Sequence, residues 1–228
     1  MEHKELSFKT AIITGVGGFF GSHLCERLLT MGIKVIGVDI NENVKERFKS
    51  PNYSHITATF EDYSQLHTMI MEPVDIFFHF AWSGGLLQES FWNYELQLKN
   101  AYFGCIAFEE ANKIGCKRFI NSGTNNQIST KQNLCAVDFT PRGTDIYSAS
   151  KTCLELICKT LATRAQTEFI GTMIPMPYGK GNRSMQLFNV VVKNLLDGQS
   201  PKLIEGKNLY DIVYVEDVVS AFIAVADE

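Results

Sequence analysis

The sequence lacks several features that would assign it to a specialised class. No apolar run approaches the roughly 20 residues of a membrane span, and the charged first ten residues contain no apolar segment of a secretory signal. The six cysteines and five histidines form no Cys-x-x-Cys pair and no grouping at metal-ligand spacing. These absences predict a cytoplasmic protein with reduced cysteines used for packing, and without membrane contact or a metal site.

Clustered positive charge is also missing. The chain has 21 Lys and Arg against 25 Asp and Glu, a net charge of -4, and the basic residues are scattered. Binding to nucleic acid depends on neutralising phosphates with grouped cations, so a nucleic-acid partner is not expected. The 228 residues are 45% hydrophobic and 20% charged, which is ordinary for a globular protein with one sizeable core.

The stretch from Thr10 to Asp39 has the pattern of a dinucleotide-binding unit. A short apolar run, Ala11 to Ile13, leads into Gly15, Gly18 and Gly21, and an amphipathic helix follows. Such glycines allow a tight turn, a bare backbone beside phosphates, and close packing of helix on strand. The pyrophosphate of a dinucleotide would then lie at the N-terminus of the helix, where free N–H groups favour an anion.

Asp39 ends the second apolar strand of this unit, at Lys34 to Val38. A carboxylate at this point is suited to binding the hydroxyl groups of an adenosine ribose. A role as an ordinary strand-end or capping residue is the alternative. No basic residue follows Asp39 until Lys45, so a 2′-phosphate would meet negative charge, and NAD is favoured over NADP.

Beyond Asp39 the pattern alternates between helix and strand, which predicts a doubly wound parallel sheet of the Rossmann type. The long helix at 89–114 has more apolar residues than one buried face requires, which suggests a helix–helix contact and a possible dimer. The polar stretch 122–142 is expected to be a binding loop over a strand end. Helices are predicted at 41–48, 63–71, 89–114, 145–163, 185–196 and from 216 onward, and strands at 55–58, 74–80, 116–121, 168–174 and 211–215.

Tyr147 and Lys151 are four residues apart on the helix at 145–163, so they share one face. A nearby ammonium favours the phenolate, and it is expected to lower the pKa of Tyr147 from its usual value near ~10. Tyr147 could then act as a general base toward a substrate hydroxyl. The alternative is a solvated Tyr/Lys pair, because this spacing is common by chance.

Several further segments accompany this pair in a consistent order along the chain. They are TGVGGFFGSHL at 14–24, Asp39, HFAW at 79–82, Asn100, RFINSGT at 118–124, YSASK at 147–151, PYGKG at 177–181 and DIVYVEDVVSAF at 211–222. Together they resemble the NAD-dependent epimerase/dehydratase family of extended short-chain dehydrogenases/reductases, whose members act on nucleotide sugars. The resemblance covers nearly the whole chain.

The resemblance implies a set of cofactor contacts and a catalytic trio. Thr124 and Tyr147 would hold the reacting oxygen, Tyr147 as the base, and Lys151 would also hold the nicotinamide ribose. In such sites a sugar hydroxyl is oxidised to a ketone, and reduction from the opposite face inverts the carbon. The cofactor would contact Gly15, Gly18, Phe19, Phe20, Gly21, Asp39, Phe60, Phe80, Ala81, Trp82, Asn100, Lys151 and Tyr178.

Five positions differ from the pattern of the family. Thr59 stands where Asp is frequent beside the adenine, Met176 where Asn contacts the sugar nucleotide, and Tyr210 where Arg is common. Dehydratases usually have Thr-Asp-Glu where this chain has Thr124-Asn125-Asn126. Amides cannot exchange the protons that water elimination needs, which argues against 4,6-dehydratase chemistry.

The resulting prediction is an NAD-dependent nucleotide-sugar epimerase, with a nucleotide-linked 4-keto-sugar reductase or dehydrogenase as the alternative. Residues 1–175 would form the NAD-binding Rossmann domain with the catalytic residues, and 176–228 would form part of a small substrate-binding lobe, interleaved with returning Rossmann elements. Members of the family usually continue further, so this lobe is expected to be truncated and the chain could be a catalytically impaired NAD-binding member. The resemblance also implies a homodimer through the helices at 89–114 and 145–164.

Overall fold

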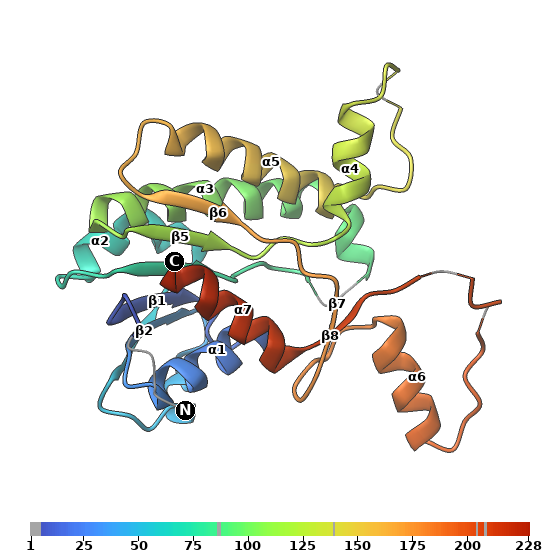
Figure 1. Cartoon of the computed structure of the whole chain (residues 1–228), viewed down its shortest axis with the longest axis horizontal. Helices are drawn as coiled ribbons and strands as arrows, with labels where there is room; N and C mark the ends of the chain where they lie inside the picture. Colours follow the sequence, from blue (N-terminus) through green and yellow to red (C-terminus); the bar gives the residue numbers. More distant parts are fainter. Residues whose placement is uncertain (1–5, 86–87, 139, 204, 208) are drawn as a thin grey trace.

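A computed structural model describes residues 6–85, 88–138, 140–203, 205–207 and 209–228. Its centre is a six-stranded sheet with the order β3-β2-β1-β4-β5-β6, in which every pair is parallel (Figure 1). The strands are β1 Thr10–Thr14, β2 Lys34–Asp39, β3 Tyr53–Thr57, β4 Ile76–His79, β5 Arg118–Asn121 and β6 Glu168–Gly171. This strand order is doubly wound, and it confirms the predicted Rossmann-type α/β fold.

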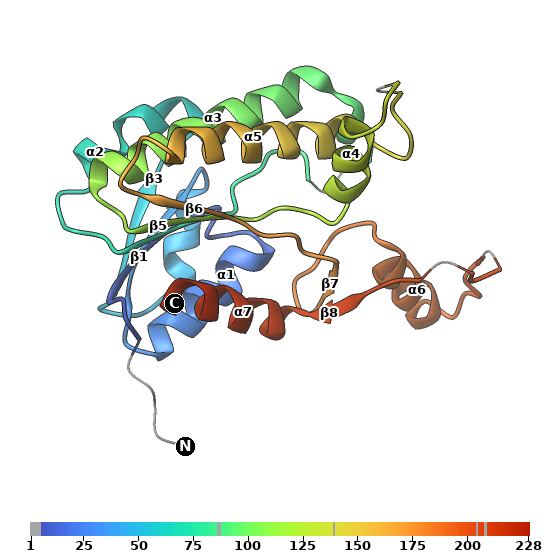
Figure 2. The same cartoon turned by 45° about the horizontal axis from the view of Figure 1, so that its top comes forward.

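The central strands are apolar on both sides because helices cover both faces of the sheet. Neighbouring side chains of a strand point to opposite faces, so Ile13 and Phe78 join one core cluster while Ile12 and Phe77 join the other. Figures 1 and 2 show the two helical layers on either side of the sheet. One layer holds α1 Phe19–Thr30 and α7 Val215–Asp227, and the other holds α2 Leu66–Met69, α3 Tyr94–Ile114 and α5 Ile146–Ala162.

Several predicted helices are shorter than expected. The helix predicted at 41–48 is a 3-10 helix, η1 Glu42–Arg47, and the one predicted at 63–71 is divided into η2 Phe60–Gln65 and α2. The helix predicted at 89–114 is divided into η3 Gln88–Trp92 and α3. The cause of this last break is Asn93, whose side chain caps α3 by accepting a hydrogen bond from the Leu96 N–H at 3.1 Å.

Two elements appear where the sequence predicted none. The stretch predicted to be a loop contains the helix α4 Gln127–Leu134, so a loop throughout 122–142 is wrong. The strand predicted at 168–174 ends at Gly171, and a short strand β7 Met176–Tyr178 follows it. β7 pairs in parallel with β8 Ile212–Tyr214 in a separate two-stranded sheet.

The cysteines were predicted to be reduced packing residues. All six are free thiols, but Cys135 and Cys153 are exposed and therefore do not serve packing.

The small sheet and α6 Leu187–Leu196 extend to one side of the main sheet, beside the carboxyl ends of its strands (Figure 1). After β8 the chain returns as α7 to the main core, where Val219 and Phe222 pack with the residues of α1. The division of the chain at residue 175, with Rossmann elements that return after it, stays a prediction, and α7 lies in the core of the main sheet.

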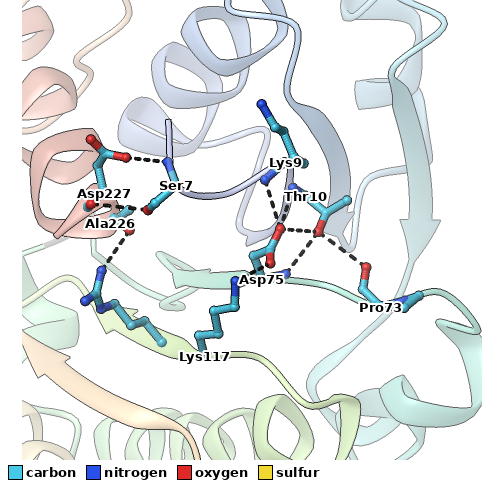
Figure 3. Close-up of polar contacts among 9 residues, drawn as sticks. Ser7, Lys9, Thr10, Pro73, Asp75, Lys117, Ala226 and Asp227 are labelled. Atoms are coloured by element: carbon cyan, nitrogen blue, oxygen red, sulfur yellow. Dashed lines mark hydrogen bonds and ion pairs between the residues drawn. The ribbon is translucent and has the colours of Figure 1, made fainter. Parts of the chain in front are cut away.

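The amino ends of the strands are joined by polar contacts (Figure 3). The Asp75 carboxylate, just before β4, accepts hydrogen bonds from the Lys9 N–H at 2.9 Å and the Thr10 N–H at 3.1 Å, and it pairs with Lys117 at 3.0 Å. The end of α7 is attached to the same edge, because the Ser7 N–H donates to Asp227 at 2.6 Å. Asp75 thus connects the starts of β1, β4 and β5.

Replacing Asp75 with alanine is expected to lower the free energy of unfolding by roughly 1–3 kcal/mol, because several donors would lose their acceptor. Burial raises the pKa of Asp75, but hydrogen bonds from Lys9, Lys117 and Thr10 outweigh it and leave the pKa below its usual value. The contribution is therefore present above pH ~4 and lost as the pH falls below that value. Urea titration at pH 7 measures the effect. Asp138→Ala, at an exposed ion pair, should leave stability nearly unchanged.

Candidate cofactor and substrate site

The glycine turn lies between β1 and α1 and leaves no room for a side chain at Gly15 or Gly21. Gly15 has a φ of +67°, and a Cβ atom there would lie 2.8 Å from the backbone nitrogen of Ala81. A Cβ atom on Gly21 would lie 2.3 Å from the carbonyl oxygen of Gly15. Gly18 is the extended residue just before α1 and provides no side chain to cap the helix. The first turn of α1 contains no acidic residue. The N–H groups of that turn are therefore available to an anion.

Asp39 lies at the end of β2, directly beside the turn. Its carboxylate accepts hydrogen bonds from the Gly17 N–H at 2.9 Å and from the Asn41 N–H at 3.0 Å. Gly17 leaves room for this contact, because a Cβ atom there would lie 3.1 Å from Asp39 Oδ2. Asp39 therefore holds the turn and also borders the cavity beside it. Ribose binding by Asp39 stays a prediction.

Two cavities meet at the glycine turn, with volumes of about 500 Å³ and about 1200 Å³. Gly18, Phe80 and Trp82 border both cavities, so one elongated ligand could extend from the first into the second. The smaller cavity is also lined by Gly15, Asp39, Phe60 and Ala81, and the larger one by Phe19, Phe20, Tyr147 and Lys151. The fold thus brings together most of the residues that the sequence predicted for the cofactor.

Four predicted residues border neither cavity among the described residues. Gly21 serves packing, as described above. Asn100 exchanges two hydrogen bonds of 2.9 Å with the backbone of Ser83, and it fixes the loop that carries Trp82. Tyr178 packs against Phe188 and Tyr214 in the small lobe. Thr124 follows β5 and forms an isolated bridge with Ile174. Direct ligand contacts of these four residues stay predictions.

Tyr147 and Lys151 lie at the start of α5, which Asp145 caps by accepting a hydrogen bond from the Ser148 N–H at 2.7 Å. The Tyr147 ring stacks on Phe91, with 4.7 Å between ring centroids, and meets the edge of Trp82 at 5.8 Å. Lys151 donates a hydrogen bond of 2.7 Å to the carbonyl oxygen of Ser122. Its ammonium also lies 3.9 Å from the centroid of the Trp82 ring, a cation–π contact.

Burial dominates the electrostatics of this pair. It lowers the pKa of Lys151 to about 7, because little water reaches the ammonium. Burial, with a smaller contribution from the charge of Asp145, raises the pKa of Tyr147. The lowered pKa that the sequence predicted for Tyr147 is therefore wrong, since burial raises this pKa. The reason is that Lys151 is directed toward Ser122 and Trp82, so it does not offset the desolvation of the phenol.

The smaller cavity is also bordered by Thr59 and Phe60, where the sequence predicted a contact with adenine. The Thr59 hydroxyl donates to Asp62 at 2.7 Å and caps η2, so it is occupied within the protein. The neighbouring Phe60 stacks on Phe103, with ring centroids 5.4 Å apart. Phe60 thus presents a fixed aromatic surface to the cavity.

His23 was not among the predicted site residues, although it borders the larger cavity. Its Nδ1 lies 2.6 Å from Glu216 Oε1, and its Nε2 lies 2.9 Å from the carbonyl oxygen of Lys180. His23 thereby joins α1, the start of α7 and the segment after β7. Its partners are 193 and 157 residues away along the chain, so no local pattern could reveal them.

Fold and cavities define a Rossmann-type protein that binds a dinucleotide. A family model described as "NAD dependent epimerase/dehydratase family" matches residues 11–228. The chain belongs to the NAD-dependent epimerase/dehydratase family, which confirms the resemblance seen in the motifs, and its cofactor is NAD. Within the described residues there is no helix whose length and apolar content would let it cross a membrane.

Two curated relatives align with this chain at low sequence identity. "Uncharacterized protein y4nG" of Sinorhizobium fredii is 26% identical, with 96% of this chain and 54% of that protein aligned. "Probable UDP-glucuronate 4-epimerase" of Rhizobium meliloti is 24% identical, with 93% of this chain and 66% of that protein aligned. The chain thus spans about half to two thirds of the length of these relatives.

Solved structures share the fold at low identity. UDP-glucuronic acid 4-epimerase from Bacillus cereus, in complex with UDP-glucuronic acid and NAD, aligns with a TM-score of 0.79 and 20% identity. The alignment covers 96% of this chain and 73% of that one. UDP-glucose 4-epimerase from Thermotoga maritima, with UDP-glucose, aligns with a TM-score of 0.76 and 21% identity over 93% of this chain and 71% of that one.

Proposed function

We propose that the protein is an NAD-dependent nucleotide-sugar epimerase that works through a keto-sugar intermediate. The observation that carries the proposal is the position of Tyr147 and Lys151 in the larger cavity, which continues past the glycine turn into the smaller one. The relatives that are named as epimerases of UDP-sugars support the same reaction. The paired amides Asn125 and Asn126 argue against the dehydratases of the family.

The residues of the turn fit NAD. The glycine backbone and the free first turn of α1 are suited to the pyrophosphate, Asp39 to the adenosine ribose, and Lys151 to the nicotinamide ribose. When bound, NAD would supply the nicotinamide that accepts and returns the hydride. The oxidised nicotinamide would also bring a positive charge near the phenol. The two cavities have room for both halves of such a ligand and for a sugar beside Tyr147.

In this proposal Tyr147 removes the proton of the sugar hydroxyl and later returns it. Burial favours the neutral phenol, and the positive charge of oxidised NAD beside it would favour the phenolate. Thr124 holds the reacting oxygen, and Lys151 orients the ribose. The rings of Phe91 and Trp82 fix the Tyr147 ring and limit the access of water.

Turnover without added cofactor tests the proposal. Purified protein is incubated with UDP-, GDP- and dTDP-sugars, and products are separated by chromatography while absorbance at the NADH band is followed. An epimer formed catalytically without net NADH supports the epimerase. Stoichiometric NADH, or a requirement for NADH with a keto sugar, would instead identify the reductase or dehydrogenase. Binding of NAD with no conversion of any sugar would identify an impaired member.

We also propose a homodimer through α3 and α5. These helices pack together and expose apolar side chains on their outer side, including Tyr94, Leu98 and Tyr102 of α3 and Leu156 and Ile157 of α5. Exposed apolar faces of this kind are typical of association surfaces. Sedimentation should give a dimer for the wild-type protein and a monomer for Leu98→Glu combined with Leu156→Glu. A monomeric wild-type protein at micromolar concentration would contradict the proposal.

A further inference from the structure

One face of α5 presents three functional side chains in a row. Tyr147, Lys151 and Glu155 are each one helical turn apart, and the first two border the larger cavity. Glu155 is only 6% exposed, although it carries a carboxylate. A buried carboxylate is costly unless it is fully paired, so its partners indicate what it does.

Glu155 is connected to Thr124 through one buried amide. Gln127, at the start of α4 and 1% exposed, donates from Nε2 to Glu155 Oε2 at 2.9 Å. Its Oε1 accepts a hydrogen bond of 2.9 Å from the Thr124 N–H. A carboxylate can only accept, so it forces the NH₂ group of Gln127 toward itself and the amide oxygen toward Thr124.

The segment 122–124 is shaped to accept this amide. A Cβ atom on Gly123 would lie 2.5 Å from Gln127 Oε1 and 2.0 Å from the carbonyl oxygen of Thr172. On the other side of Gly123, the carbonyl oxygen of Ser122 accepts the hydrogen bond from Lys151. Two residues of α5 therefore hold this segment. Lys151 bonds directly to Ser122, and Glu155 acts on Thr124 through Gln127.

The negative charge of Glu155 is balanced by two lysines that are more exposed than it is. Lys159 donates to Glu155 Oε1 at 2.6 Å, and Lys131 lies 2.9 Å from Oε2. Burial alone raises the pKa of Glu155, but these two ammonium groups outweigh it and hold the pKa below its usual value. The carboxylate is therefore ionised at neutral pH and keeps its orienting effect on Gln127.

We propose that Gln127 and Glu155 are positioning residues that fix the backbone at Thr124, which follows Gly123 at the border of the cavity that holds Tyr147. The inference rests on the proposed function, in which Thr124 holds the reacting oxygen. Without the Gln127–Glu155 pair, the Thr124 N–H would lose its side-chain acceptor, and Thr124 would keep its bridge to Ile174 and its contacts with the N–H groups of Asn126 and Gln127. A displacement of Thr124 by about 1 Å is enough to slow a reaction about 100-fold.

The test uses Gln127→Met and Glu155→Met, with Glu155→Gln as the conservative variant. Both methionine variants should lower kcat about 10- to 100-fold while the Kd for NAD changes less than about threefold. Glu155→Gln keeps an acceptor oxygen for Gln127 and should recover most of the lost kcat. Glu110→Met is the matched control, because Glu110 is a buried carboxylate of α3 that pairs with Lys113 and His67. It should lower the melting temperature by a similar amount without lowering kcat.

A second readout does not depend on catalysis. Hydrogen exchange of the Thr124 amide, followed by NMR, should be at least about tenfold faster in both methionine variants than in the wild-type and Glu110→Met proteins. Unchanged exchange, or unchanged kcat in variants that are folded at the assay temperature, would overturn the inference. If the wild-type protein converts no sugar nucleotide, the proposed function fails, while the exchange measurement still decides whether Gln127 and Glu155 hold Thr124.

Discussion

Tyr147→Phe is expected to lower kcat about 10³-fold, within the range for loss of a general base. Phenylalanine preserves the stacking on Phe91 and the edge contact with Trp82, so the site should remain assembled. The Kd for NAD should change less than about threefold, since the removed hydroxyl acts on the substrate in the reaction. Initial rates with the best sugar nucleotide, and titration with NAD, measure the two quantities.

Tyr94→Phe is the matched control, because Tyr94 is an exposed tyrosine at the start of α3. It should leave both kcat and NAD binding unchanged. A Tyr147→Phe protein that retains more than about a tenth of the wild-type kcat would contradict the role of Tyr147 as the base. Melting curves of both variants show whether any loss reflects unfolding.

The fold was largely predictable because its strongest signals are local. Apolar runs such as Ala11 to Ile13 predict strands buried on both faces, and three spaced glycines predict the turn that follows. α4 was missed because its sequence, QISTKQNL, has almost no apolar side to detect. Its buried residues Gln127 and Thr130 are polar, and they are satisfied by partners on α5 and before it. β7 was missed because three residues including Pro177 carry too little pattern.

In the candidate site, too, some residues could be predicted from local patterns and others could not. Asp39, Tyr147 and Lys151 could be selected because each belongs to a short motif at the end of a strand or the start of a helix. His23 and Glu216, or Gln127 and Glu155, become partners only when distant segments meet in the fold. The direction of the pKa shift of Tyr147 was also not predictable, since it depends on how deeply the fold buries the phenol.

Lys151→Met is expected to lower kcat about 100-fold and to weaken NAD binding about tenfold, because the ribose would lose an ammonium donor. The same variant should be more stable than the wild-type protein at pH 6. The reason is that the wild-type fold keeps a buried cation, for which the cation–π contact with Trp82 and the hydrogen bond to Ser122 compensate only in part. Methionine fills the same space without charge.

The sign of the pH dependence makes this prediction specific to the charge of Lys151. Its pKa is about 7 in the folded protein and about 10.4 in an unfolded chain, so the unfolded state binds more protons between these values. Wild-type stability should therefore rise with pH across this window, and the advantage of Lys151→Met should shrink from pH 6 toward pH 10. Urea titrations of both proteins at several pH values measure the difference. Lys193→Met, at an exposed lysine of α6, should show no such trend. An advantage of Lys151→Met that is the same at pH 6 and pH 10 would mean that better packing, rather than removal of the buried charge, stabilises the variant.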